Sequence, residues 1–229
     1  MKLQINFVSQ QNNTIRNDCG AAAVAMCASN AGAAVTTDDV LRAIEQPKDK
    51  ALHFQDMYQA LRAFGLRFEY VRPLHLPDLR RWLANGNPVI ALVGYGQLPP
   101  EHKAQRNFDG AHFVLVVGYT PDAFLVHDPL WPDARGAYRE WSVEVMGTAL
   151  LRPGWGNQPL QGIVVQRPFP IIEPEMAELG LAVSAALSSA VATSYLEKLL
   201  DAMAIEPGPL DERVGHALAR ITVWQAAGR

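Results

Sequence analysis

The first half of the chain places apolar residues at the intervals expected of helices. An Ala-rich, uncharged run over residues 19–30 predicts a helix buried on most faces, with Asn17 or Asp18 as its N-cap. A capping-box pattern at Thr36 predicts the start of a second helix. The helices expected after the first one cover residues 37–45, 54–64 and 76–84.

The second half of the chain carries short β-branched, apolar runs bounded by Gly, Pro and Asp. Each run has about the five or six residues usual for a core strand. Because the helices come first and these strands later, the order predicts an α+β fold with a mainly antiparallel sheet. The expected strands are 89–93, 112–117, 124–126 and 162–166, and two further strands are expected earlier in the chain, at 3–8 and 67–71.

Three prolines within residues 168–174 predict a boundary between a first domain, 1–168, and a helical extension, 169–229. Within the extension, residues 179–196 carry no charge over a length close to that of a membrane span. Five of these residues are Ser or Thr, which makes the run a poor span. Small residues at every fourth position suggest self-association through these helices, and a flexible appendage is the alternative.

Composition excludes some functions and sets a default location. The 229 residues are 49% hydrophobic and 19% charged with a net charge of −3, as in an ordinary globular protein. No stripe of Lys and Arg indicates a nucleic-acid partner. The N-terminus lacks the apolar core of a signal peptide, so we expect a cytoplasmic protein, although association with a phage or leaderless export would look the same.

The sequence from Asn17 to Met26 places a cysteine, Cys19, at the start of the buried helix. Unpaired N–H groups and the positive end of the helix dipole favour a thiolate there. Gly20 is interpreted as leaving space for substrate, and the upstream Gln10 as a side-chain donor to an oxyanion. The alternative for Cys19 is a small buried core residue, which is our interpretation of the other cysteine, Cys27.

Two polar residues flank successive strands of the second half. His112 begins one apolar strand, and Asp128 ends the next. A hairpin between these strands would bring the carboxylate back to the imidazole, the arrangement that orients a catalytic base beside a cysteine. Alone, His112 could be structural and Asp128 a turn residue before Pro129. Together with Cys19 they predict a triad.

These motifs resemble the bacteriocin-processing (double-glycine leader) peptidases and their free-standing relatives, which are papain-like cysteine peptidases. The resemblance covers residues 3–167. It implies a papain-like fold with Cys19 as nucleophile, His112 as base, Asp128 as the orienting carboxylate and Gln10 as oxyanion donor. The neighbouring Gln11 competes for the last role. The chain has no transporter segments and no P-loop, unlike the transporter-linked members.

The expected function is hydrolysis of a peptide or isopeptide bond in a peptide or protein substrate, with no metal or other cofactor. Acyl or peptidyl transfer through the same thioester is one alternative, and a peptide-binding module without turnover is another. The polar loop 95–109 either borders the substrate cleft or is solvated with no role in binding.

Overall fold

The computed structural model describes residues 1–10, 18–29, 34–47, 51–154, 157–166 and 171–172. The chain divides into two compact units, Met1–Ile171 and Ile172–Arg229. Apart from Ile172, the second unit lies outside the described residues, and so does the uncharged run 179–196. The helical extension, its boundary at residue 168 and self-association through it therefore stay predictions.

An antiparallel sheet forms the centre of the first unit. Its order is β2-β7-β3-β4-β1-β8, and β5 pairs with both β4 and β6. Every pair whose register is described is antiparallel, which confirms the predicted α+β class. The strands are β1 (Lys2–Leu3), β2 (Phe68–Val71), β3 (Val89–Gly94), β4 (Ala111–Tyr119), β5 (Ala123–His127), β6 (Arg139–Ser142), β7 (Gly162–Val165) and β8 (Ile171–Ile172).

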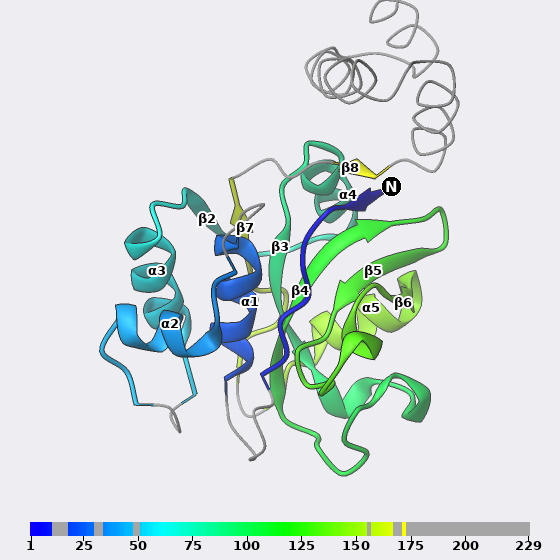
Figure 1. Cartoon of the computed structure of the whole chain (residues 1–229). Helices are drawn as coiled ribbons and strands as arrows, with labels where there is room; N and C mark the ends of the chain where they lie inside the picture. The colour runs from blue at the N-terminus through cyan, green and yellow to red at the C-terminus, as the bar shows by residue number, and fades with distance from the viewer. Residues whose placement is uncertain (11–17, 30–33, 48–50, 155–156, 167–170, 173–229) are drawn as a thin grey trace, which may run out of the picture. The chain divides into compact units, whose positions relative to one another are not determined.

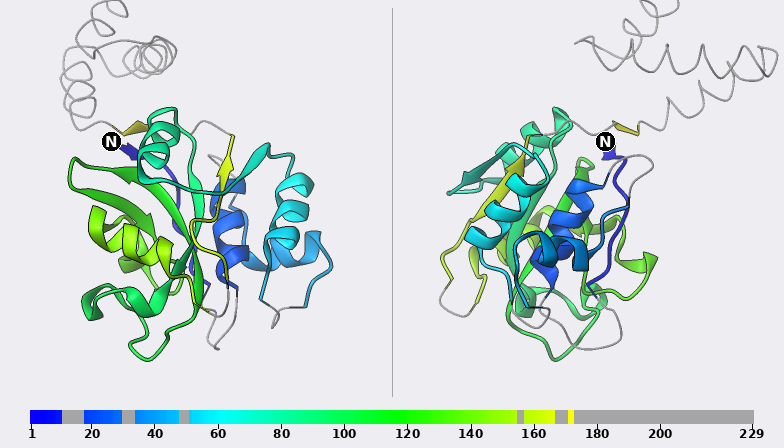
Figure 2. Two further views of the ribbon diagram at one scale, coloured as in Figure 1. Left: turned by 180° about the vertical axis from the view of Figure 1, so that it is seen from behind. Right: turned by 60° about the vertical axis from the view of Figure 1, so that its left-hand side comes forward.

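Helices cover both faces of the central strands. Figure 1 shows α1 (Cys19–Ala28), α2 (Thr37–Ala43) and α3 (Phe54–Ala63) on one side of β3 and β4. In the view from behind, α5 (Val143–Leu151) lies on the opposite side with β5 and β6 (Figure 2). All of β3 is buried as a result. The remaining helix is α4 (Leu76–Ala84).

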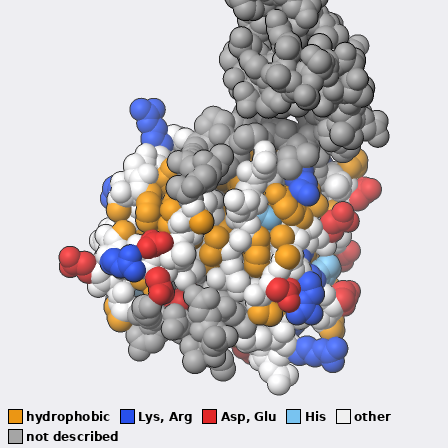
Figure 3. Space-filling model, in the orientation of Figure 1, with side chains coloured by type: hydrophobic (Ala, Val, Ile, Leu, Met, Phe, Trp, Pro, Cys, Tyr) orange, Lys and Arg blue, Asp and Glu red, His pale blue; other side chains and the backbone are white. Residues whose placement is uncertain are grey.

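The first helix is buried on all sides because its residues are small. Every residue from Gly20 to Ala28 is buried, and six of the ten residues of α1 are Gly or Ala. Their size lets the helix approach β4 closely, and larger side chains from the sheet fill the space. On the face drawn in Figure 3, hydrophobic side chains gather in the middle and charged ones lie towards the margins.

Most predicted elements are present with slightly different ends, but one predicted strand is much shorter and some elements were not predicted. The capping box at Thr36 is confirmed, since its side chain accepts from the Asp39 N–H. The strand expected at 3–8 is only Lys2–Leu3, because side chains rather than a neighbouring strand bind the backbone beyond it. The sequence interpretation contained neither β6 nor α5. No helix within the described ranges is long and apolar enough to cross a membrane.

Candidate active site

Cys19 is the first residue of α1, as predicted. Asp18 occupies the N-cap position, although its side chain makes no capping bond and its carbonyl instead accepts from the Ala22 N–H at 2.8 Å. Asn17, the other predicted cap, lies outside the described residues. Cys19 is partly exposed, whereas the rest of its helix is buried. Cys19 is thus the residue of α1 that lies at the helix N-terminus and is partly exposed.

Gly20 serves packing, which corrects the sequence interpretation that it leaves space for substrate. It is buried, and a Cβ atom there would lie 3.1 Å from Leu52 Cβ and 3.1 Å from Met57 Sδ. These contacts are tighter than most side chains tolerate. The glycine therefore allows the start of α1 to pack against α3 and the segment before it.

His112 and Asp128 lie on the same face of the β4–β5 hairpin. Leu115 pairs with His127, so Asp128 comes opposite the residue two positions from His112, and side chains two apart on a strand share a face. The His112 Nε2 and Asp128 Oδ1 atoms are 2.8 Å apart. Asp128 follows β5 rather than ending it, and both side chains are almost fully buried. The hairpin thus joins the predicted base and carboxylate.

The second ring nitrogen of His112 is left for Cys19. Because Nε2 contacts Asp128, Nδ1 is the ring nitrogen that remains to act on the thiol. Burial disfavours both charged forms. In His112 the charge and hydrogen bond of Asp128, aided by Cys19, outweigh burial and raise the pKa to about 10. In Cys19 the hydrogen bond and charge of His112, aided by the N–H groups of Phe113 and Gly20, outweigh burial and lower the pKa. The pair thus favours a thiolate beside an imidazolium.

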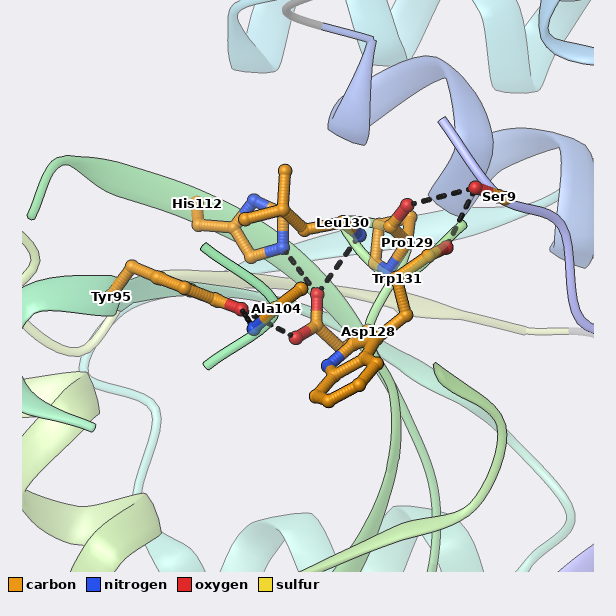
Figure 4. A network of polar contacts seen from close by, with 8 residues as sticks. All are labelled: Ser9, Tyr95, Ala104, His112, Asp128, Pro129, Leu130 and Trp131. Atoms are coloured by element: carbon orange, nitrogen blue, oxygen red, sulfur yellow. Dashed lines mark hydrogen bonds and ion pairs between the residues drawn. The ribbon is translucent and has the colours of Figure 1, made fainter. Parts of the chain in front are cut away.

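Three donors hold the Asp128 carboxylate (Figure 4). Its Oδ1 atom contacts His112 and accepts from the Leu130 N–H at 3.0 Å. Its Oδ2 atom accepts from the Tyr95 hydroxyl at 3.1 Å. Sequence reasoning missed Tyr95, whose only signal is its place at the end of the strand that pairs with the His112 strand.

Gln10 lies on a segment that is attached to the loop after Asp128. Its backbone N–H donates to the Pro129 carbonyl at 2.8 Å, and the Ser9 hydroxyl donates to the Trp131 carbonyl at 2.7 Å. The Gln10 side chain is 5% exposed. The segment with the predicted oxyanion donor is thereby held beside Asp128. Gln11, its competitor, lies outside the described residues.

His127 is a second site residue whose role the sequence did not reveal. It is fully buried, its Nε2–H donates to the Ile5 carbonyl at 2.9 Å, and its Nδ1 accepts from the Tyr138 N–H at 3.0 Å. The Tyr138 hydroxyl in turn donates to the Leu3 carbonyl at 3.0 Å. Together the two side chains bind the N-terminal segment that leads to Gln10.

The chain matches a known protein family. A family model described as the Peptidase_C39 like family matches residues 2–149. The chain belongs to this family. Membership and fold together support a cysteine peptidase type of function for this C39-like chain. A comparison with curated protein sequences finds no match.

Solved structures of C39-like peptidases resemble the C39-like chain. A putative C39-like peptidase from Bacillus anthracis has a TM-score of 0.52 at 15% identity, over 74% of this chain and 99% of that one. The peptidase domain of Streptococcus ComA, a bifunctional ABC transporter of a quorum-sensing pathway, has a TM-score of 0.49 at 18% identity, over 73% and 98%. A double glycine motif protease from an AMS/PCAT transporter, in complex with the leader peptide, has a TM-score of 0.46 at 16% identity, over 72% and 92%. At these identities the first likeness shows the fold.

The part of the C39-like chain that the structure describes holds no group of three or more His, Cys, Asp or Glu side chains that could bind a metal ion. The expectation that the reaction needs no cofactor stays a prediction.

Proposed function

We propose that the protein is a cysteine peptidase that hydrolyses a peptide or isopeptide bond through Cys19, His112 and Asp128. One observation carries the proposal: the His112 ring contacts Asp128 at 2.8 Å through Nε2, and the same ring lowers the pKa of Cys19 at the start of α1. This connectivity gives the nucleophile a base and gives the base a fixed tautomer. Family membership supports the same class of reaction.

In the proposed reaction the Cys19 thiolate attacks the carbonyl carbon of the substrate. The oxyanion is bound by the Cys19 backbone N–H and the Gln10 side-chain amide, donors that act on charge formed in the transition state. The His112 Nδ1–H then protonates the leaving amine, and a thioester remains. Water attacks the thioester while His112 removes its proton, which releases the carboxylic acid and restores the thiolate. Asp128 holds the imidazole throughout.

The substrate is a peptide or protein, in keeping with the family and with the leader peptide bound by one related protease. Transfer to an amine instead of water would use the same thioester. Hydrolysis and transfer are separated by product analysis with and without an added amine.

The test is labelling of Cys19 with iodoacetamide from about pH 5 to about pH 9, located by peptide mass. We expect Cys19 to react well below the thiol pKa of about 8.5, and His112→Ala to abolish this reactivity because the imidazolium that supports the thiolate is removed. Cys27, buried in the same helix, is an internal control that should not react in the folded protein. Cys19 reactivity no higher than that of Cys27, or unchanged in His112→Ala, would contradict the proposed triad.

A further inference from the structure

Tyr95 contacts both members of the His–Asp pair although it lies far from them in the sequence. It is the first residue of the 3-10 helix η1 (Tyr95–Gln97) and is fully buried. Its hydroxyl binds Asp128 Oδ2, and its ring meets the His112 ring edge-on, with centroids 5.0 Å apart and planes at 79°. Figure 4 shows the hydroxyl directed at one carboxylate oxygen of Asp128 and the His112 ring directed at the other.

The direction of the Tyr95 hydroxyl hydrogen follows from its second contact. The Ala104 backbone N–H donates to the same oxygen at 2.7 Å. A hydroxyl has a single hydrogen, so with Ala104 as donor that hydrogen is given to Asp128. Burial and the negative charge of Asp128 raise the pKa of Tyr95, which keeps the hydroxyl protonated.

The Tyr95 bond fixes how the Asp128 carboxylate is turned. Oδ1 is shared by His112 and the Leu130 N–H, while the bond described for Oδ2 comes from Tyr95. A buried carboxylate oxygen that loses its donor bears a large desolvation cost and tends to turn towards another donor. Any such rotation would move Oδ1 out of line with His112 Nε2.

We propose that Tyr95 is a positioning residue of this site, holding Asp128 so that it aligns and supports the His112 imidazolium. The proposal rests on the proposed function. It also gives the loop 95–109 a role beyond bordering a cleft or being solvated: through Ala104 and Phe108 the loop holds Tyr95, and Phe108 packs at 5.4 Å from its ring. The loop conformation thereby determines how well the carboxylate is placed.

The experiment is iodoacetamide labelling of Cys19 against pH in Tyr95→Phe, which keeps the ring and removes only the hydroxyl. Besides Asp128 and Tyr95, the groups that act on the pair are Cys19 and, through its charge, Arg139 of β6. We expect the pH range over which Cys19 is labelled fast to become about one pH unit narrower than in wild type, because the imidazolium that supports the thiolate is itself less well supported. About one pH unit is the size expected for one lost hydrogen bond to a charged group. Thermal unfolding shows that the variant is folded.

Two controls make the result specific. Tyr70→Phe removes an exposed hydroxyl that binds Gln161 at 2.9 Å and should leave the range unchanged. In an Asp128→Asn background, Tyr95→Phe should add no further narrowing, because Tyr95 acts through the carboxylate.

Each outcome decides the inference separately from the proposed function. A range that stays the same or widens in Tyr95→Phe overturns it, because an unanchored carboxylate cannot support the imidazolium better. The inference is also overturned if Tyr95→Phe narrows the pH range of labelling by the same amount in the Asp128→Asn background. If wild-type Cys19 reacts slowly and independently of His112, the proposed function fails first, before Tyr95 is tested.

Discussion

Protonation of His127 should break its hydrogen bond from the Tyr138 N–H and destabilise the protein in mild acid. The neutral ring donates to the Ile5 carbonyl through one nitrogen and accepts from the Tyr138 N–H through the other. A proton on Nδ1 would place a hydrogen against the Tyr138 N–H. Burial, aided by the charge of Lys2 and opposed by the Ile5 bond, lowers the pKa of His127 from 6.5 to about 4.

The size of the effect follows from that pKa difference. Because the folded pKa is below the unfolded value, the unfolded chain binds the proton first as the pH falls. The contribution of His127 to stability is complete above pH 6.5 and is lost as the pH falls from 6.5 to about 4. Since one pKa unit corresponds to about 1.4 kcal/mol, the loss between pH ~7 and pH ~4.5 is about 2 kcal/mol.

The assay is urea unfolding of wild type and His127→Gln at these two pH values. Glutamine keeps an amide N–H donor but does not titrate in this range. Wild type should lose about 2 kcal/mol more than the variant on acidification, and the subtraction removes contributions common to both proteins, such as that of His112. His75→Gln, which removes an exposed imidazole at the start of α4, is the matched control and should follow wild type.

An equal loss in wild type and His127→Gln would refute the reasoning. It would mean that His127 does not enter the folded state as a neutral donor to Ile5. A greater loss in the variant would have the same meaning, since the sign of the linkage would then be reversed.

Two further substitutions test packing and the attachment of Gln10. Gly20→Ala should lower the free energy of unfolding by about 1–2 kcal/mol, because the added Cβ would press on Leu52 and Met57. Urea unfolding measures this change, and an unchanged unfolding midpoint would contradict the packing role of Gly20. Ser9→Ala removes the hydroxyl that donates to the Trp131 carbonyl and should slow hydrolysis about three- to tenfold while thermal stability changes little. Unaltered turnover would show that this bond does not place Gln10.

Elements with a strong period in the sequence were predictable almost to the residue. The helix expected at 76–84 is α4, and the run at 89–93 is β3 with one residue more. Missing β6 and α5 has a local cause: residues 139–151 are short, mixed runs whose structure depends on β5 and on the sheet face that α5 covers. The periodicity of a single sequence gives no information about β5 as a pairing partner or about the sheet face that α5 covers.

The residues of the candidate site likewise include some that the sequence pattern predicted and some that it could not predict. Cys19 was found because it begins α1, His112 because it lies at the start of β4, where it is the second residue, and Asp128 because it follows β5. The pattern could not reveal Tyr95, since its importance depends on the pairing of β3 with β4 and on the loop that returns past its hydroxyl. Gly20 was misinterpreted for a similar reason: only the packing of α1 against α3 shows that a Cβ at this position would contact Leu52 and Met57 too closely.

The distribution of the site along the chain has a consequence for biosynthesis. The ribosome makes Cys19 early, while His112 and Asp128 follow much later on one hairpin. Until that hairpin forms and α1 docks against β4, the thiol has no imidazolium beside it and keeps the modest reactivity of an ordinary cysteine. A nascent or partly unfolded chain of the proposed peptidase is therefore latent, and completion of the fold acts as its activation step.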